Sequence, residues 1–287
     1  MRTMNTASCF LAVTITVLAV STAAAQAPTP APGPPPGPTP RLADGTPNLG
    51  RVAGEKGVWN IGWVADFGDR VVGHEVPAAQ RKTGYNPNHP GAASQPQVPT
   101  MPWSAAVYEY NLKNQGKYDP EGFCLPPGGP RMMVTPYPME ILQLPEQKRI
   151  VMIFEGATHI WREIYMDGRA HPTGDALNPT YLGHSVGRWE GDTLVIDVVG
   201  FNEASWLDPI GHPHTDQLHL IEKLTRVNKN VLHYEVTIDD PGAYTKPWTV
   251  SWDIPWRPTG ELTEYICQEN NKYLHRLTDD FDQPLFK

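Results

Sequence analysis

This sequence is poor in cysteine, in charged side chains and in long apolar runs. Only three cysteines occur in 287 residues, and charged residues make up 19% of the chain. After its N-terminal segment, no stretch approaches the ~18 uninterrupted apolar residues that a membrane-spanning helix needs. The sequence also contains no P-loop and no glycine-rich dinucleotide fingerprint behind a strand. We therefore expect neither a membrane span nor a nucleotide cofactor.

Basic residues are also scarce relative to acidic ones. The chain has 23 Lys and Arg residues against 31 Asp and Glu residues, which gives a formal net charge of −8. Such a surface repels polyphosphates, so no nucleic acid partner is expected. The expected partner is a small-molecule ligand or substrate.

The N-terminal segment, residues 1–25, has the composition of a secretory signal peptide. Arg2 supplies a positive charge, an apolar stretch follows over residues 10–20, and three alanines at 23–25 form a small-residue cleavage site. Residues 26–40 are rich in proline and favour extended geometry, which predicts a spacer. The predicted location is periplasmic or secreted.

Loss of the signal peptide would leave only Cys124 and Cys267 in the mature chain. In an oxidising compartment two remaining cysteines predict a disulfide between them. The alternative is a pair of free thiols that serves as a metal or redox site. The pair lacks the CxxC spacing that such a site favours.

Two regions follow the spacer. Residues 41–139 are irregular and rich in Gly and Pro, and they predict an arm packed on the main domain, with one short helix over 104–114. Residues 140–287 hold eight short segments rich in β-branched and aromatic residues, separated by turn signals. These segments are 140–144, 149–155, 159–166, 193–200, 218–227, 231–239, 249–256 and 261–267.

Eight strands linked mainly by short turns predict a mainly β fold, an antiparallel meander. A closed or nearly closed barrel with lipocalin-like architecture removes the exposed edges of such a sheet. A barrel of this size either fills its interior with side chains or holds one small ligand.

Glu222 stands out because it alternates with leucines on the apolar face of its strand. A carboxylate buried between Leu220 and Leu224 costs several kcal/mol unless it is protonated or paired. Arg162 is the first candidate for its partner. Two interpretations stay open: a structural ion pair, or a general acid or base in an apolar cavity.

The segment DGRAHP contributes further candidate catalytic residues. Asp167 and the following glycine predict a hairpin turn, and Arg169 and His171 lie just past it. With Arg162 they could meet at one barrel mouth. There an arginine would hold a carboxylate and the histidine would transfer a proton.

The stretch GHPHTDQLH contains His212 and His214 two positions apart. On an extended chain two such imidazoles share a side and can bind Zn²⁺ or Cu²⁺ with a third ligand. Candidates for that ligand are His219, His184 and His171. The alternative is a polar loop in which the histidines are solvated or hydrogen-bonded.

Four segments together resemble a family of exported, largely uncharacterised bacterial proteins. They are IYMDGRAHP (164–172), GHSVGRWEGDTLVIDVVGFN (183–202), WLDPIGHPHT (206–215) and DDPGAYTKPW (239–248). The family signatures are DGRxHP, GxWEGDTLVVDT and a GHPHS-like motif, and Thr215 stands here in place of the serine. The resemblance implies export and one continuous β-rich domain. It implies no activity, cofactor or catalytic residue.

Three functions are compatible with these features. The first is an exported barrel enzyme that acts on a small organic substrate by acid/base chemistry, as a hydrolase, lyase or isomerase. The second is a non-catalytic carrier of an amphipathic small molecule. The third is a protein that binds a divalent metal ion through the histidine loop.

Overall fold

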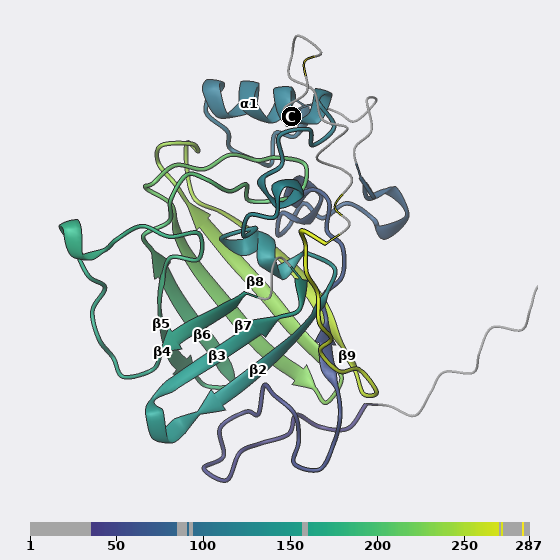
Figure 1. The fold of residues 1–287 in the computed structure, drawn as a ribbon, viewed down its shortest axis with the longest axis vertical. Coiled ribbons are helices and arrows are strands. Elements are labelled where there is room, and N and C mark those ends of the chain that lie inside the picture. Colours follow the sequence, from purple (N-terminus) through teal and green to yellow (C-terminus); the bar gives the residue numbers. More distant parts are fainter. Residues whose placement is uncertain are drawn as a thin grey trace, which may run out of the picture. The chain divides into compact units, whose positions relative to one another are not determined.

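The computed structural model describes residues 36–84, 91, 94–156, 160–269, 271 and 283. The predicted signal peptide, most of the predicted spacer and residue 159 lie outside these residues. Among the described residues, nine strands form a closed barrel (Figure 1). The strands are β1 (Val58–Asn60), β2 (Pro138–Leu144), β3 (Arg149–Phe154), β4 (Trp161–Tyr165), β5 (His184–Glu190), β6 (Thr193–Val199), β7 (His219–Asn228), β8 (Val231–Asp239) and β9 (Trp248–Arg257).

Helical structure is sparse in the described part of the chain. Its one α-helix is α1 (Pro102–Lys113). Six short 3-10 helices are η1 (Phe67–Arg70), η2 (Ala78–Gln80), η4 (Pro120–Phe123), η5 (Pro130–Met133), η6 (Pro145–Gln147) and η7 (Gly174–Ala176). The prediction of a mainly β fold with a closed barrel and one short helix is confirmed.

The strands follow one another around the barrel in chain order. All neighbouring pairs are antiparallel except β4 and β5, which are parallel and match Ile164 with Ser185. Parallel neighbours need a connection that returns to the starting end of the sheet. Residues 166–183 make that connection, so the meander is interrupted at this point.

Two predicted details of the barrel are wrong. Residues 261–267 form no strand, and the barrel is closed instead by β1, from the segment expected to be an arm. Trp59 of β1 is matched with Met139 of β2 on one side and with Trp256 of β9 on the other. β5 was also missed. A three-residue strand is too short to show alternation, and Gly187 interrupts the apolar pattern of β5.

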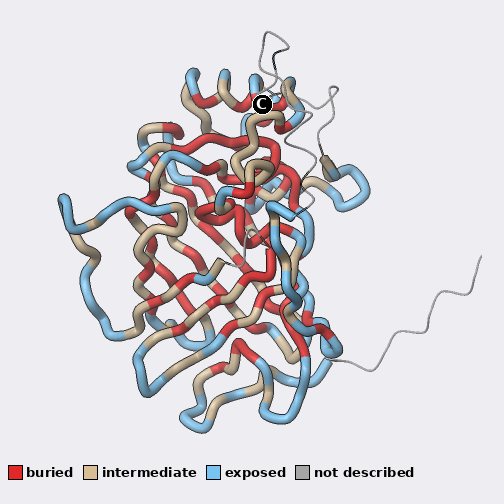
Figure 2. The backbone as a smooth tube through the Cα atoms, viewed as in Figure 1, coloured by how far each residue is buried: buried red, intermediate tan, exposed pale blue. Residues whose placement is uncertain are grey.

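Buried residues alternate with partly exposed ones along several strands of the barrel (Figure 2). Along β7 and β8 every second residue is buried, and the positions between them are partly exposed. Leu220, Glu222 and Leu224 share the buried face, as their spacing predicts. Leu220 and Leu224 join apolar side chains of the other strands in one continuous cluster.

α1 lies with several loops over one end of the barrel, while residues 41–57 run across the other (Figure 1). The helix begins with Pro102 in its first turn, where the missing N–H costs nothing. Its buried side holds Ser104, which donates to the Ala243 carbonyl at 2.6 Å, and Asn111, which donates to the Gly211 carbonyl at 2.9 Å. Among the described residues, no helix combines the length and apolar character needed to cross a membrane.

Arg226 closes the other end of the barrel, a role that sequence analysis did not predict. Its guanidinium lies over the rings of Trp59 and Trp256 at 4.9 and 5.2 Å from their centroids. It donates to the carbonyls of Asn48, Gly50 and Lys229. Burial lowers the pKa of Arg226 to about 10. This cation is thus held by aromatic rings and carbonyl oxygens.

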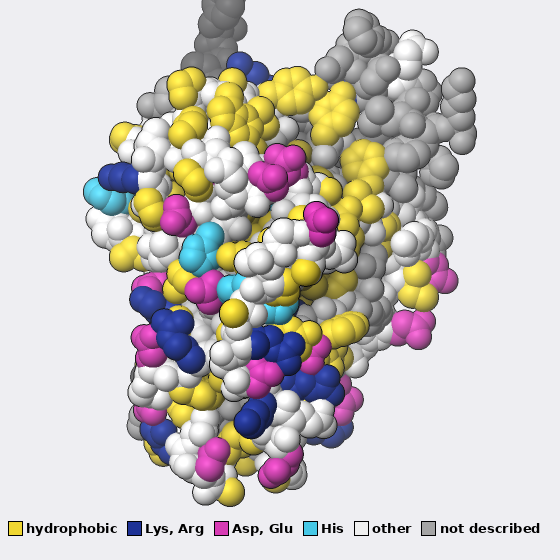
Figure 3. All heavy atoms as spheres, turned by 90° about the vertical axis from the view of Figure 1, so that its left-hand side faces the viewer, with side chains coloured by type: hydrophobic (Ala, Val, Ile, Leu, Met, Phe, Trp, Pro, Cys, Tyr) yellow, Lys and Arg dark blue, Asp and Glu magenta, His cyan; other side chains and the backbone are white. Residues whose placement is uncertain are grey.

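The outer face of the barrel is polar. On the side shown in Figure 3, basic and acidic side chains are interspersed over its lower part. Between β7 and β8, Lys223 and Glu235 form an ion pair with their charged atoms 2.8 Å apart. Opposite charges on facing strands contribute a few tenths of a kcal/mol to about 1 kcal/mol.

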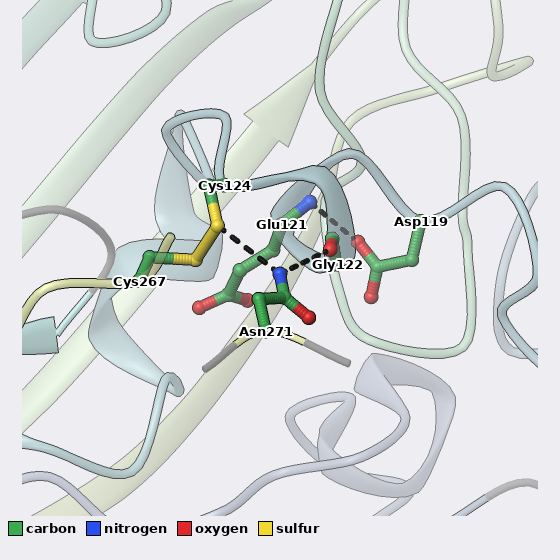
Figure 4. Close-up of a disulfide and its surroundings, with 6 residues drawn as sticks. All are labelled: Asp119, Glu121, Gly122, Cys124, Cys267 and Asn271. Atoms are coloured by element: carbon green, nitrogen blue, oxygen red, sulfur yellow. Dashed lines mark hydrogen bonds between the residues drawn. A yellow bond between two sulfur atoms is a disulfide. The ribbon is translucent and has the colours of Figure 1, made fainter. Parts of the chain in front are cut away.

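Cys124 and Cys267 form a disulfide, as predicted (Figure 4). Cys124 has a positive φ of 60° at the end of η4. The Asn271 side chain donates to the Gly122 carbonyl and to the Cys124 sulfur, both at 3.3 Å. The bridge therefore ties the segment after β9 to the loops that follow α1.

Replacement of both cysteines by serine should lower the free energy of unfolding by about 4–5 kcal/mol. The bridge joins residues separated by 143 positions, and in the chain-entropy model such a loop restricts the unfolded chain strongly. Urea denaturation of the wild type and the C124S/C267S variant measures the difference. Reduction of the wild type should reproduce the loss, and equal stability of the reduced and oxidised proteins would contradict the prediction.

Candidate functional site

Glu222 lies in the barrel interior and is paired there with Arg162, as the sequence predicts. The guanidinium of Arg162 donates to Glu222 Oε2 through Nη2 and to the Ser185 hydroxyl through Nε at 2.9 Å. The Tyr234 hydroxyl donates to Glu222 Oε1 at 2.5 Å. All four side chains are at most 4% exposed. Both carboxylate oxygens therefore have hydrogen-bond partners.

The charges of this network favour a structural role. Burial alone would lower the pKa of Arg162, but the carboxylate of Glu222 outweighs burial and raises that pKa. Burial and then the same carboxylate raise the pKa of Tyr234 well above its ordinary value of 10. Arg162 thus keeps its charge, and Tyr234 is a neutral donor. A catalytic role for Glu222 stays a prediction.

The other predicted catalytic residues lie apart from this pair, outside the barrel wall. Arg169 forms an ion pair with Asp167 at 2.6 Å and lies over the Tyr165 ring, 3.8 Å from its centroid. His171 contacts the outward-pointing Asp197 of β6 at 3.1 Å. The structure therefore does not bring these residues to one mouth with Arg162. The turn at Asp167 places them over the outer face of the sheet.

His171 belongs to a chain of polar contacts across β5, β6 and β7. Its Nδ1 lies 2.8 Å from Nδ1 of His184, and Asp197 Oδ1 lies 2.9 Å from Nε2 of His219. Figure 3 shows histidine side chains beside acidic ones on this face. Burial, followed by the charges of His171 and Arg169, lowers the pKa of His184. We call these three histidines and Asp197 the outer-face histidine cluster.

His212 and His214, the predicted metal pair, are both buried and face different partners. His214 Nε2 lies 3.0 Å from the Ser205 hydroxyl, and its Nδ1 lies 3.1 Å from the Thr215 carbonyl. Burial lowers the pKa of His214. Both of its ring nitrogens are thus occupied, and His214 is not part of the candidate metal group. The loop is neither solvated nor a two-histidine chelate.

His212 instead joins two buried aspartates. One ligand atom from each of Asp66, Asp208 and His212 lies within 4.8 Å of the others, and all three side chains are buried. His212 Nδ1 is 2.6 Å from Asp208 Oδ2. Two carboxylates and an imidazole are a ligand set that divalent transition metals accept. We call these three residues the Asp-His cluster.

Backbone donors hold both carboxylates of this cluster. Asp208 Oδ1 accepts from the N–H groups of Gly211 and His212, and Asp66 Oδ1 accepts from Gly68 N–H at 2.6 Å. Asp66 is the N-cap of η1, which accounts for its bond to Gly68. These bonds fix one oxygen of each carboxylate. The other oxygen, Oδ2, takes the side-chain contacts of the cluster, and Oδ2 of Asp208 also accepts from Phe67 N–H at 2.8 Å.

Three more side chains complete the surroundings of Asp66. Its Oδ2 accepts from the Tyr108 hydroxyl and from Gln95 Nε2, both at 2.9 Å, and Lys82 Nζ lies 3.5 Å away. Tyr108 of α1 also stacks on the His212 ring, with centroids 4.2 Å apart. Burial and then the charges of Asp66 and Asp208 raise the pKa of Tyr108.

The second ring nitrogen of His212, Nε2, differs from Nδ1 in its surroundings. Within the described part of the chain, Nε2 of His212 has no hydrogen-bond partner although it is buried. Burial alone would lower the pKa of His212, but the Asp208 carboxylate outweighs burial and raises it. A buried polar atom without a partner is unfavourable by about 1–3 kcal/mol, which suggests that a water or an ion satisfies it.

Asp66 also lines an open cleft of about 220 Å³ between η1 and η2, which we call the arginine cleft. Its lining residues are Trp63, Val64, Ala65, Asp66, Asp69, Arg70, Ala78, Arg81, Lys82 and Thr83. A larger hollow of about 500 Å³ lies against β9 and includes Trp248. The arginine cleft is the better candidate for a ligand-binding site, because Asp66 of the Asp-His cluster is one of its lining residues.

Sequence analysis missed Asp66, Asp208 and Tyr108. Asp208 lies four residues before His212 in WLDPIGHPH, a spacing that could have suggested a local carboxylate and imidazole pair. No comparable signal identifies Asp66, which is brought to the site by a fold in which distant segments meet.

No protein-family model matches this chain, and no curated protein or solved structure matches it either. The resemblance to an exported bacterial family therefore stays a prediction. The function has to be inferred from the site itself.

The replacement of Glu222 by Gln should lower the free energy of unfolding by about 3–5 kcal/mol, because it leaves the Arg162 charge buried without a counterion. Urea denaturation followed by circular dichroism measures this loss. The double variant E222L/R162M should recover most of it, since it removes both charges together. A single variant as stable as the wild type would show that the ion pair does not hold the barrel interior together.

Proposed function

We propose that this protein is an exported metalloprotein that binds one divalent transition-metal ion at the Asp-His cluster. The observation that carries the proposal is the close approach of ligand atoms from Asp66, Asp208 and His212, all within 4.8 Å of one another. Export is supported by the disulfide and by the signal-like N-terminal segment.

The residues present suit such an ion. Outer hydrogen bonds that orient ligands are a common feature of metal sites, and here backbone N–H groups orient both carboxylates. Two carboxylates carry two negative charges, which a divalent cation neutralises. A bound ion would also stabilise the packing of α1, because Tyr108 of that helix contacts both Asp66 and His212.

The purified protein should bind one equivalent of Zn²⁺ after treatment with a chelator. Isothermal titration gives the stoichiometry, and the free energy of unfolding should rise by about 2.7 kcal/mol at a free zinc concentration 100 times the dissociation constant. Co²⁺ in place of Zn²⁺ should give the absorption bands of a low-coordinate site.

Variants identify the ligands. D208N and H212Q should lose the bound equivalent, whereas H171Q serves as the matched control because the outer-face histidine cluster is the obvious competitor for zinc. Each variant should unfold cooperatively by circular dichroism. Binding that persists in D208N and H212Q but disappears in H171Q would place the metal elsewhere and overturn the proposal.

A second candidate function uses the same cluster without a metal. We propose, as this alternative, an exported enzyme that acts on a small organic substrate by acid/base chemistry, with Asp208 orienting His212. The unpartnered Nε2 of His212 favours it, because an imidazole held at Nδ1 by a carboxylate is a common general base. Turnover by chelator-treated protein, lost in H212Q, would support the enzyme over the metalloprotein.

The carrier function and the Glu222 centre also stay predictions. Both were expected to use the barrel interior, where the side chains form one packed cluster. A ligand is therefore better accommodated at the end of the barrel that α1 covers.

A further inference from the structure

The arginine cleft has positive charge at its rim in a protein that is acidic overall. Three cations line it, Arg70, Arg81 and Lys82, against two carboxylates, Asp66 and Asp69. Lys82 is already engaged, because its Nζ lies 3.5 Å from Asp66 Oδ2 and 3.4 Å from Asp69 Oδ1. The three cations and two carboxylates together give the cleft one excess positive charge.

Arg70 lines the cleft beside Asp69, whose carboxylate acts on its charge. The Arg70 guanidinium forms no hydrogen bond or ion pair with any residue in the part of the chain that the structure describes. Arg70 and Arg81 line the same cleft. Burial and then the charge of Arg81 lower the pKa of Arg70, while the carboxylate of Asp69 raises it. Two close guanidinium groups attract an anion that neutralises their repulsion.

Hydrogen bonds hold the backbone of the cleft and the Arg81 side chain in place. Asp69 Oδ2 accepts from the N–H of Lys82 at 2.9 Å, which ties the end of η1 to the residue after Arg81. Arg81 Nε donates to the Val76 carbonyl at 2.7 Å, and Val76 N–H donates to the Asp69 carbonyl at 3.1 Å. The cleft is therefore formed before any ligand arrives, which reduces the entropy lost on binding.

Trp63 supplies an apolar wall. Its indole N–H donates to the Thr83 carbonyl at 3.0 Å, yet the side chain remains 41% exposed. An indole fixed by its N–H presents its ring to whatever occupies the cleft. The volume of about 220 Å³ suits a small molecule.

We infer that the arginine cleft binds a small organic monocarboxylate, with the carboxylate between Arg70 and Arg81 and the organic group against Trp63. One excess positive charge matches a monoanion better than a doubly charged phosphate, and the indole favours an organic group over an inorganic ion. This inference goes beyond the proposed metal site, because none of these three side chains belongs to the Asp-His cluster.

The probe is 4-fluorobenzoate, and its neutral analogue 4-fluorobenzamide is the matched control. Titration of the full chain followed by ¹⁹F NMR should show saturable binding of the benzoate and at least about tenfold weaker binding of the amide. R70Q and R81Q should each weaken benzoate binding by about tenfold or more. R188Q, on the outward face of β5, should bind like the wild type.

Three outcomes would overturn the inference: equal binding of benzoate and benzamide, unchanged binding in both R70Q and R81Q, or tighter binding of inorganic phosphate. Circular dichroism of each variant shows that it is folded. The titration is run on chelator-treated and on zinc-loaded protein. Benzoate binding without zinc binding would support the carboxylate site and contradict the metal site. Zinc binding without benzoate binding would contradict the carboxylate site alone.

Discussion

The carboxylate of Asp208 holds together several segments that lie outside the barrel strands. It accepts hydrogen bonds from Phe67 N–H at the start of η1 and from two N–H groups of its own loop, and it contacts the His212 ring. An unpaired charge at full burial costs several kcal/mol, so these segments cannot separate without leaving that charge unsatisfied. The loop, η1 and, through Tyr108, α1 are thus held as one unit.

Two buried carboxylates in this protein serve different purposes because their surroundings differ. Glu222 meets one arginine and one tyrosine inside the barrel, and both of its oxygens are satisfied. Asp208 meets an imidazole whose second nitrogen has no partner among the described residues. Satisfied networks stabilise one structure, whereas a buried polar group without a partner needs a further explanation, such as a water or a ligand. The proposed metal site therefore lies at the covered end of the barrel, and barrel mouths are a common place for small-molecule sites.

The sequence predicted features that repeat along one strand or that demand a partner. Alternation over the ten residues of β7 is long enough to recognise, and it placed Glu222 on the buried face. A carboxylate on that face required a cation as its partner, and Arg162 was the first candidate. The Asp-His cluster had neither signal, because Asp66 caps η1 and Asp208 lies in a loop of a distant part of the chain. Pro213 suggested an exposed loop, but the loop folds beneath α1, and its histidines are buried.

The closure of the barrel rests on its shortest strand. β1 has three residues, and it lies between β2 and β9, which have seven and ten. Displacement of β1 would turn both neighbours into open edges with unpaired N–H and C=O groups. Such edges pair readily with other chains. The short segment that forms β1 therefore protects the protein from aggregation, and proteolysis near Trp59 would expose both edges.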